Sequence, residues 1–412
     1  MRLIHTSDWH LGHRFHGRRR YEEQERFLDW LAGLIEEQGI DVLLVAGDVF
    51  DTTTPGSRAL TLYYRFLHRL AGSPCRHVIL IGGNHDSPAL LEAPRELLRQ
   101  LRIHVVGAVE DNLDKEVLLL SDKGGRAELL VCAVPFLRDR DIRTSAAGES
   151  LEEKGLKLQQ GVKEHFQQVC LAAERIRQDI DPSLPLVVLG HLFVAGGQTV
   201  EGDGVRELAI GGLNRIEGTS FPDSIDYLAL GHLHLAQLVA GSTTRRYCGA
   251  PLPMSFNEAD QSKLILSVSC EGRSVEVAPI PVPRFQPLAS LRGDLPALLQ
   301  GLAELKDTGS SVWLELHYEG REVLPNLREQ LLAAVEDTAL EILRIRNNRI
   351  YDFALQQEAE GESLDDLSVT EVFERCLDTG QLEENQRLAA RGAFTEILAA
   401  LSQEDDETEL SP

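Results

Sequence analysis

Five apolar runs of the chain each end in a short segment that carries histidine, asparagine or aspartate, and this repetition limits most strongly what the chain can fold into. The runs cover residues 2–6, 42–46, 77–81, 186–189 and 227–230. Each is short, apolar and followed by a residue that breaks strands, which is typical of a buried strand. The segments that follow are SDWH (7–10), GDVFD (47–51), GGNHD (82–86), GH (190–191) and GHLH (231–234).

The side chains at the ends of these strands are expected to meet. In open α/β sheets, ligands gather at the carboxyl ends of the strands, and a glycine before a ligand lets the backbone turn sharply. The five segments contain seven candidate metal ligands: Asp8, His10, Asp48, Asn84, His191, His232 and His234. Seven mixed oxygen and nitrogen donors are too many for one transition-metal ion, and they suit two ions that share a bridging carboxylate.

The donor types also narrow the choice of metal. Imidazole together with carboxylate and amide oxygen favours Mn, Fe or Zn over Mg or Ca, and the lack of cysteine in the set argues against a structural zinc. A single Asp-x-His pair is a weak signal, because a lone histidine is more often a core or surface residue. Five such strand ends in one chain would require every strand to end in a ligand by chance, so the sequence predicts a binuclear metal site.

The order of the elements predicts an α/β fold with a layered core, in which central β-sheets are flanked by helices. Helical patterns at 22–38, 57–70 and 150–180 alternate with the five runs and with a further strand at 130–134. The segment Pro281-Val282-Pro283-Arg284 punctuates the chain and indicates a boundary. We therefore expect a first domain over residues 1–280.

Two further parts are expected after this boundary. A strand–helix–strand–helix–strand pattern, at 287–291, 295–305, 311–318, 324–336 and 340–346, predicts a small α+β domain over residues 284–346. The remainder, residues 347–412, combines an acidic linker with a C-terminal pair of helices. The first of these begins at a capping box formed by Ser368 and Glu371, and the second carries Ile397 and Leu398.

Charge and cysteine usage set further limits. The net charge is −24, but residues 281–412 hold 27 acidic and only 11 basic residues, so most of the negative charge lies in the C-terminal third. A local basic cleft is therefore still compatible with nucleic acid. The 6 cysteines have no CxxC spacing, and we find neither a signal-peptide pattern nor an apolar run long enough to cross a membrane. We expect a reduced, cytoplasmic protein.

The five segments together, in their order along the chain, resemble the calcineurin-like metallophosphoesterases. Within that group the chain is most similar to bacterial nuclease subunits that work with a coiled-coil ATPase in DNA repair and recombination. This closer resemblance rests on HTSDWHLG (5–12), VAGDVFDT (45–52), YCGAPLPMSF (247–256) and LSVTEVF (367–373). The resemblance implies an exonuclease on double strands, an endonuclease on single strands and hairpins, and two divalent ions, of which Mn²⁺ fits best.

The resemblance also implies roles for individual residues. The first ion would be held by Asp8, His10, Asp48 and His234, and the second by Asp48, Asn84, His191 and His232, so that Asp48 bridges the two. In the family, the histidine that matches His85 supports the transition state and the leaving oxygen, and Asp86 is expected to orient it. The loop at 193–197 is less similar to the family than its surroundings.

Contacts with DNA and with protein partners are also expected. Four arginines directly follow the first segment, Arg14, Arg18, Arg19 and Arg20, and their position beside the candidate ligands favours contact with DNA phosphates over the alternative of a solvated basic loop. We expect His13 and His16 to be free loop residues. The small α+β domain would cap the nuclease domain and contact DNA. Four apolar residues of the C-terminal helices, Phe373, Leu377, Ile397 and Leu398, would dock on the ATPase, in an assembly of two nuclease and two ATPase subunits.

Several alternatives stay open at this point. The apolar face of residues 57–70 suits either the protein's own core or a dimer of nuclease domains. The C-terminal helices could instead fold back onto the small domain. An enzyme acting on phosphomonoesters or on cyclic nucleotides could use the same metal core, although it would not need the extra C-terminal material. A non-catalytic scaffold is disfavoured by the intact ligand set.

Overall fold

The structure is a computed structural model that describes residues 1–109, 112–142, 149–194, 196–198, 216–320, 324, 326–347 and the single positions 377, 387, 391 and 394. It divides into two compact units. The first consists of Met1–Ser290 with Ser311–Leu314, and the second is drawn from Leu291–Ser310 and Glu315–Pro412.

The first unit contains two six-stranded sheets. The first sheet has the order β14-β13-β1-β4-β5-β6, and its four strands β1, β4, β5 and β6 run parallel. These strands are β1 (Arg2–Thr6), β4 (Val42–Ala46), β5 (His77–Ile81), β6 (Ile103–Val106), β13 (Leu264–Glu271) and β14 (Ser274–Pro281). The strands β13 and β14 form an antiparallel hairpin that pairs with β1.

The second sheet has the order β11-β12-β10-β9-β8-β7. Its strands are β7 (Val117–Ser121), β8 (Ala127–Ala133), β9 (Leu186–His191), β10 (Tyr227–Gly231), β11 (Gln237–Val239) and β12 (Ser242–Tyr247). The four strands β8, β9, β10 and β12 run parallel, and the outer strands β7 and β11 are antiparallel to their neighbours. A separate hairpin pairs β2 (Arg14–Phe15) with β3 (Arg18–Arg19).

Alternation along the strands explains how the two sheets are layered. On β4, Val42 and Leu44 join an apolar cluster shared with Val187 and Leu189 of β9, so this cluster fills the space between the sheets. The intervening residues, such as Leu43 on β4, point the other way, into a cluster with α1 and α2. Because successive strand residues face opposite sides, strands buried on both faces become continuous apolar runs.

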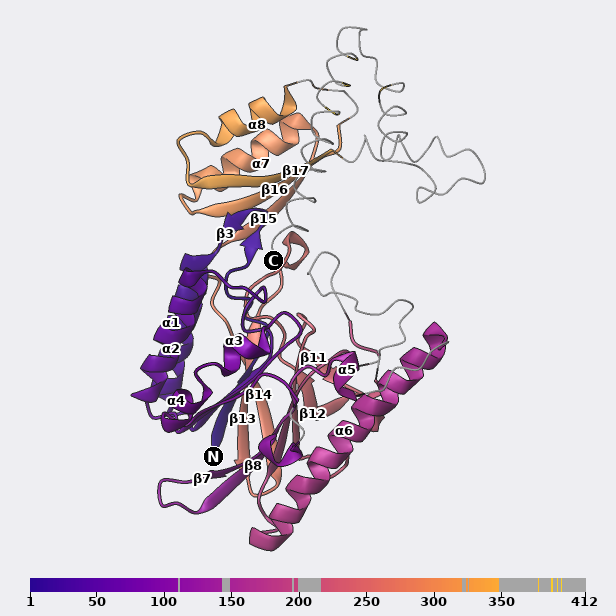
Figure 1. Cartoon of the computed structure of the whole chain (residues 1–412). Helices are drawn as coiled ribbons and strands as arrows, with labels where there is room; N and C mark the ends of the chain where they lie inside the picture. Colours follow the sequence, from indigo (N-terminus) through magenta and orange to yellow (C-terminus); the bar gives the residue numbers. More distant parts are fainter. Residues whose placement is uncertain are drawn as a thin grey trace. The chain divides into compact units, whose positions relative to one another are not determined.

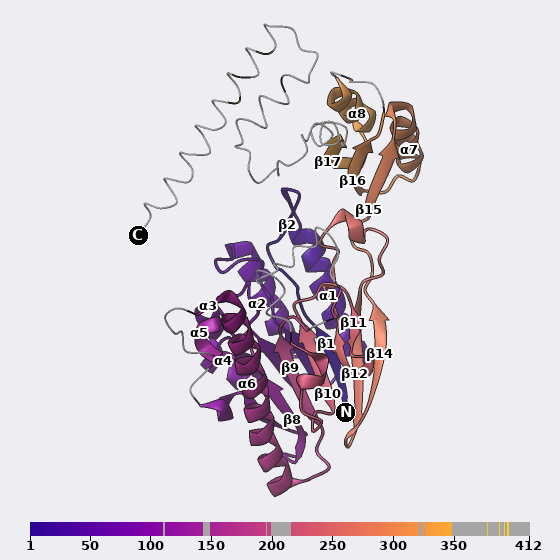
Figure 2. The ribbon, with the colours of Figure 1, turned by 90° about the vertical axis from the view of Figure 1, so that its right-hand side faces the viewer.

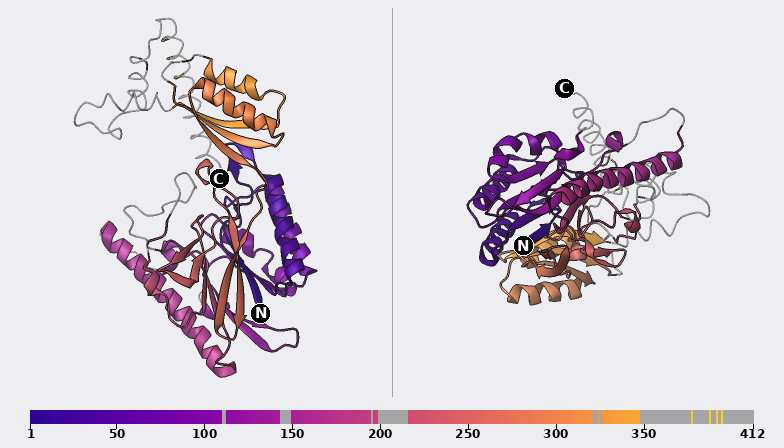
Figure 3. Two further views of the ribbon diagram at one scale, coloured as in Figure 1. Left: turned by 180° about the vertical axis from the view of Figure 1, so that it is seen from behind. Right: turned by 90° about the horizontal axis from the view of Figure 1, so that it is seen from below.

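Helices cover the outer face of each sheet (Figure 1). The first is covered by α1 (Tyr21–Gln38) and α2 (Ser57–Ala71), with α3 (Pro88–Glu92) and α4 (Arg95–Gln100) near β6. The second is covered by the single long helix α6 (Leu151–Ile180), and the strands of both sheets lie between these helices (Figures 2 and 3). The predicted layered α/β core is therefore confirmed.

The long helix α6 begins where its sequence predicts. Ser150 accepts a hydrogen bond from the Glu153 backbone, and the Glu153 side chain accepts one from the Ser150 backbone, which makes a complete capping box. Val162, Phe166 and Val169 then bury one face of the helix against the second sheet. The shorter elements of the first unit are η1 (Leu113–Lys115), α5 (Asp139–Ile142), η3 (Gly218–Ser220) and η4 (Phe256–Glu258).

The C-terminal part contains a three-stranded sheet of order β15-β16-β17 and two helices. In chain order these are β15 (Leu288–Gly293), α7 (Leu295–Asp307), β16 (Val312–Tyr318), α8 (Leu327–Val335) and β17 (Leu340–Asn347). The predicted strand–helix–strand–helix–strand pattern is thus confirmed. The boundaries predicted at 280, 284 and 346 stay predictions.

The predicted C-terminal helices fall mostly outside the described residues, as do Phe373, Ile397 and Leu398. Leu377 is described: it is helical and its side chain is only 4% exposed. Among the described residues, no helix is both long and apolar enough to span a membrane.

Candidate metal centre

Six of the seven candidate ligands lie in the loops directly after β1, β4, β5 and β10, and the seventh, His191, is the last residue of β9. Two groups of them bring their ligand atoms within 4.8 Å of one another: Asp8 with His10 and His234, and Asp48 with His191 and His232. Five of these six side chains belong to loops that follow strands, and His191 is the last residue of β9. The sheets thus deliver donors from both sides to one edge of the core.

The first group brings two imidazoles together edge-on, with their ring planes 76° apart. The Nε2 atoms of His10 and His234 lie 3.2 Å apart. Two neutral imidazole lone pairs at this distance repel each other unless a proton or a cation lies between them. Ligands about 2.1 Å from one ion are separated by roughly this distance, so the pair fits a shared metal.

The second group converges on Asn84. Its Oδ1 atom lies 2.9 Å from His191 Nε2 and 2.9 Å from His232 Nδ1. These oxygen and nitrogen donors come to one place from the loop after β5, the end of β9 and the loop after β10, as an ion with mixed ligands requires. The donor set therefore fits a second metal beside the first.

Asp48 belongs to the second group and also reaches the first. Its Oδ2 atom is 3.6 Å from His10 Nε2 and 3.3 Å from His191 Nε2, so one carboxylate reaches the donors of both. Its Oδ1 atom accepts a hydrogen bond of 2.9 Å from the backbone N–H of His85. This is the position that a bridging carboxylate would occupy.

The backbone is strained at several of these residues. Asp8, His10, Asp48 and His232 have φ values of 54°, 43°, 50° and 100°. Non-glycine residues rarely adopt positive φ, and such strain of about 1–3 kcal/mol per residue persists only where the surroundings impose it. Four of the seven candidates share this feature, which supports a functional reason for the conformation.

Gly83 shows why a glycine is needed in the loop after β5. A Cβ atom at this position would clash with both the backbone N and the carboxylate of Asp48. Any larger residue would therefore push apart the loop after β4, which carries Asp48, and the loop after β5, which carries Asn84.

Charges within the centre depend strongly on one another. Burial raises the pKa of the Asp8 carboxyl to about 6, and the Asp48 carboxylate adds to this rise. Burial also opposes ionisation of Asp48, but the imidazoles of His191 and His10 outweigh it and hold that pKa well below its usual value. Burial likewise opposes protonation of His191, yet Asp48 outweighs it and raises the His191 pKa to about 9. The carboxylates thus attract positive charge to the centre.

His85 is oriented by the backbone of Asp51. The His85 Nδ1 atom lies 2.7 Å from the Asp51 carbonyl oxygen, so Nδ1 carries the hydrogen and donates it. The His85 ring also packs edge-on against His10, with centroids 4.9 Å apart. With the hydrogen fixed on Nδ1, Nε2 is the ring nitrogen that can take up and release a proton.

The predicted role of Asp86 as the orienter of His85 needs correction. The Asp86 carboxylate accepts hydrogen bonds from the backbone N–H groups of Gly83, Val49 and Phe50. Asp86 therefore joins the loop after β4 to the loop after β5. The group that accepts the hydrogen bond of His85 Nδ1 is the Asp51 carbonyl.

Asp51 and Gln24 are functional candidates that the sequence did not single out. The Asp51 carboxylate lies 3.4 Å from His10 Nδ1 and 2.9 Å from His13 Nδ1, so His13 is not a free loop residue. Gln24 of α1 donates to the His10 carbonyl and accepts from the Gly12 N–H, which fixes the first loop. The motif Gly-Asp-x-x-Asp contains Asp51 and could have drawn attention to it, whereas nothing in the sequence marks Gln24.

The arginines after the first loop separate into two kinds. Arg14, Arg18 and Arg19 are exposed on the hairpin of β2 and β3, whose turn at His16 and Gly17 has φ values of 47° and 84°. Arg20 is different: it is 2% exposed, donates to Glu23 and to the Pro253 carbonyl, and stacks over Phe15. Because its guanidinium is buried and paired, the predicted DNA contact at Arg20 is replaced by a structural role.

The apolar face of α2 packs inside the protein. Leu62, Tyr63, Phe66, Leu67 and Leu70 are buried in the cluster shared with α1 and the first sheet. Of the two interpretations left open, this face is core. Tyr64, on another side of the helix, stays exposed.

Comparison with known proteins identifies the class first. The model of the calcineurin-like phosphoesterase family matches residues 1–236, and that of the Type 5 capsule protein repressor C-terminal domain matches residues 284–380. The first match covers more than half of the chain, so the chain belongs to the calcineurin-like phosphoesterases and is a metal-dependent phosphodiester hydrolase.

Similar proteins show which subgroup of this class the chain belongs to. The chain is 36% identical over 409 residues to the SbcD subunit of the SbcCD nuclease of Escherichia coli (strain K12), covering 98% of this chain and 100% of the relative. It is 35% identical over 321 residues to the protein of that name from Rhodobacter capsulatus, covering 74% of each, and 32% identical over 273 residues to that from Bacillus subtilis, covering 66% of each. Within the phosphoesterases, the chain belongs to the SbcD family of nuclease subunits.

Proposed function

We propose that the chain is the metal-dependent nuclease subunit of an SbcCD-type complex for DNA repair and recombination. It would act as an exonuclease on double strands and as an endonuclease on single strands and hairpins. The observation that carries the proposal is the position of Asp48, whose Oδ2 lies within 3.6 Å of donors from both ligand groups. One ion would be held by Asp8, His10, Asp48 and His234, and the other by Asp48, Asn84, His191 and His232.

Each part of the site would then have a defined task. The two ions, which we propose to be Mn²⁺, would neutralise phosphate charge and lower the pKa of the attacking water. His85, fixed by its bond to the Asp51 carbonyl, would present Nε2 to the leaving oxygen as a proton donor. The exposed Arg14, Arg18 and Arg19 would bind DNA phosphates beside the metals.

The partners follow from the same family. We propose that the C-terminal helices, including Phe373, Leu377, Ile397 and Leu398, bind the coiled-coil ATPase SbcC, and that two copies of each subunit assemble through a dimer of nuclease domains in the cytoplasm. In this proposal, residues 1–280 form the nuclease domain, 284–346 a capping domain that contacts DNA, and 347–412 the linker and the ATPase-binding helices.

A cleavage assay tests this function. The purified chain, with Mn²⁺ and with or without SbcC, is given single-stranded, blunt duplex and hairpin DNA, and separately a cyclic nucleotide and a small aryl phosphodiester. We expect cleavage of single-stranded and hairpin DNA by the chain alone, and cleavage from duplex ends only with SbcC and ATP. Rapid turnover of the cyclic nucleotide with no cutting of DNA would instead assign the same metal core to a small-molecule phosphodiesterase.

A further inference from the structure

A buried lysine lies directly behind one of the proposed ligands. Lys263, just before β13, is 8% exposed, and its Nζ atom donates a hydrogen bond of 3.2 Å to the backbone carbonyl of His234. The same ammonium forms an ion pair with Glu258, which is 0% exposed. A charged pair this deep is costly to desolvate unless each partner is well satisfied, so its position beside the metal centre calls for an explanation.

The pair is held by its own segment of chain. The Ser255 hydroxyl lies 3.4 Å from Glu258 Oε1, and the Glu258 backbone N–H donates to the Ser255 carbonyl in η4. Lys263 is fixed at its other side, because its carbonyl accepts the Val282 N–H. These bonds hold the backbone of both residues, and the Ser255 hydroxyl also holds the Glu258 carboxylate.

The same segment touches the His234 loop a second time. The Ala250 N–H donates to the His234 carbonyl at 3.2 Å, so this oxygen accepts two hydrogen bonds. Gly249, with a φ of 77°, makes the approach possible, because a Cβ atom there would lie 2.8 Å from the His234 oxygen. The loop that carries His232 and His234 thus rests against residues 249–263.

We propose that Lys263 and Glu258 are positioning residues for the metal centre: their ion pair fixes the His234 carbonyl and so aims the His234 imidazole at the first ion. This inference rests on the proposed ligand set. Groups behind metal ligands typically change metal affinity by about 10- to 100-fold when they are removed. Since Lys263 acts through the backbone of a ligand, we expect an effect of about tenfold, at the lower end of that range.

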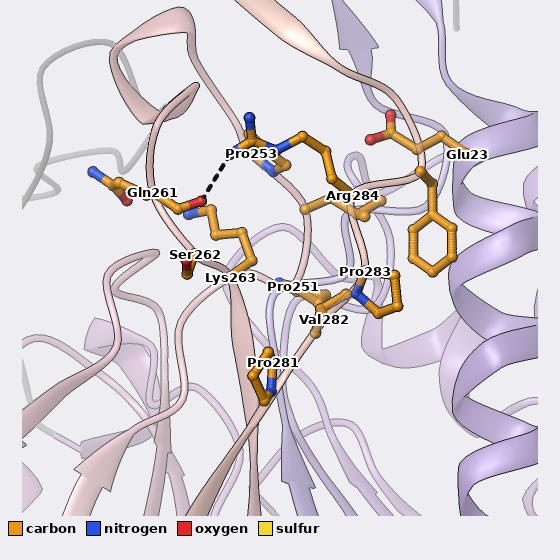
Figure 4. Close-up of a pocket in the computed structure, with 12 residues that line it drawn as sticks. Glu23, Pro251, Pro253, Gln261, Ser262, Lys263, Pro281, Val282, Pro283 and Arg284 are labelled. Carbon is orange, nitrogen blue, oxygen red and sulfur yellow. Dashed lines mark hydrogen bonds between the residues drawn. The ribbon is translucent and has the colours of Figure 1, made fainter.

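Lys263 can be replaced without opening a new void. Its side chain lies in the wall of a cavity of about 150 Å³, together with Pro251, Pro253 and Pro281 (Figure 4). Methionine has a similar unbranched stem, so Lys263→Met keeps the wall and removes the ammonium. The double variant Lys263→Met/Glu258→Gln also removes the unpaired carboxylate that the single variant would leave buried.

Arg177 supplies a matched control. This buried cation of α6 is 3% exposed, pairs with Asp226 at 3.1 Å and also with Glu174, and donates to the Leu184 carbonyl at 3.5 Å. Like Lys263 it pairs with carboxylate and carbonyl oxygens, but none of Asp226, Glu174 and Leu184 is a proposed ligand. Arg177→Met therefore reports what the loss of a buried cation does to stability alone.

The test measures metal binding by the full-length chain after chelation. Calorimetric titration with Mn²⁺, and visible spectra with Co²⁺, are recorded for the wild type, both Lys263 variants and Arg177→Met. We expect two ions in the wild type and in Arg177→Met. In both Lys263 variants, one ion should bind about tenfold more weakly, with an altered Co²⁺ spectrum, while the other is unaffected.

The outcomes separate this inference from the proposed function. If both Lys263 variants bind two ions with wild-type affinity and spectra, the positioning role is overturned while the ligand set stands. If the wild type itself binds fewer than two ions, the ligand set fails, and the inference that depends on it fails with it. Equal weakening in Arg177→Met would attribute the effect to general loss of stability and would also overturn the positioning role.

Discussion

At the scale of single residues, the arrangement of the metal centre costs free energy of folding. Asp8, His10, Asp48 and His232 all take backbone conformations that L-residues avoid. Carboxylates and imidazoles are packed together away from water, where unpaired charge is destabilising. Bound cations would offset these costs, so we expect metal to stabilise the folded chain as well as to support its chemistry.

His85 should be needed for cleavage and dispensable for metal binding. His85→Ala removes the imidazole that the Asp51 carbonyl orients, so the rate of DNA cleavage should fall by about 10²- to 10⁴-fold. Metal content by elemental analysis and DNA affinity should stay at wild-type values. His68→Ala, on the exposed side of α2, serves as the control. Loss of an ion from His85→Ala would make His85 a ligand.

His104 of β6 should make the fold sensitive to acid. Burial lowers its pKa from 6.5 to about 4, helped by neighbouring His77 and Arg99. Between about pH 6.5 and pH 4, the unfolded chain gains a proton at this residue and the folded chain does not, so the free energy of unfolding falls as the pH falls.

The variant His104→Leu tests this dependence. Urea midpoints measured at about pH 7 and about pH 5 should fall less in the variant than in the wild type, because leucine cannot take up a proton. Equal falls in the two proteins would mean that His104 is not the group responsible.

Residue types at strand ends were readable from the sequence, but their hydrogen-bond partners were not. The motif places Asp86 next to His85, yet its carboxylate meets three backbone N–H groups, because the loop turns it toward Val49 and Phe50. Arg20 belongs to a basic run, yet it turns inward to Glu23. Such orientations depend on how distant loops pack, and neither spacing nor charge encodes that.

At the scale of elements, the parallel strands were the most predictable part. The bounds predicted for β1, β4 and β5 match the structure, because strands buried on both faces are unbroken apolar runs. The hairpin of β13 and β14 was not predicted. Its outer strand, β14, alternates exposed and half-buried residues, so its apolar signal is weak.

The hairpin of β2 and β3 should contribute to DNA affinity through charge alone. Replacing Arg14, Arg18 and Arg19 with alanine should weaken binding to all sequences alike. For each phosphate that the variant no longer neutralises, the slope of log affinity against log salt should become shallower by about 0.9 on duplex DNA. Fluorescence anisotropy over a salt series measures this slope, with the exposed Lys123→Ala as the control. A slope unchanged in the triple variant would place the DNA elsewhere.

At the scale of the whole molecule, charge is distributed unevenly. Residues 281–412 hold 27 acidic against 11 basic residues, so the metal-bearing part is far less acidic than the chain as a whole. Acidic residues that flank the C-terminal helices would steer them toward a basic partner surface. Salt screens this attraction, so association should slow as the salt concentration rises.

Truncation after residue 360 tests the role of the C-terminal helices. We expect the nuclease domain to stay folded, with Mn²⁺-dependent cutting of single strands intact, while co-purification with SbcC and ATP-stimulated cutting of duplex ends are lost. The buried side chain of Leu377 makes the melting temperature the necessary companion measurement. A large drop in melting temperature with the pull-down unaffected would mean that these helices belong to the protein's own core.

The metal content of Asp48→Ala tests the binuclear centre most directly. Asp48 is the residue whose carboxylate reaches donors of both ligand groups, so its loss should affect both ions. Elemental analysis of purified protein should find two divalent ions per wild-type chain and close to none in Asp48→Ala, whereas His10→Ala should lose mainly one. A wild-type metal content in Asp48→Ala would contradict the bridged centre on which the proposed nuclease activity depends.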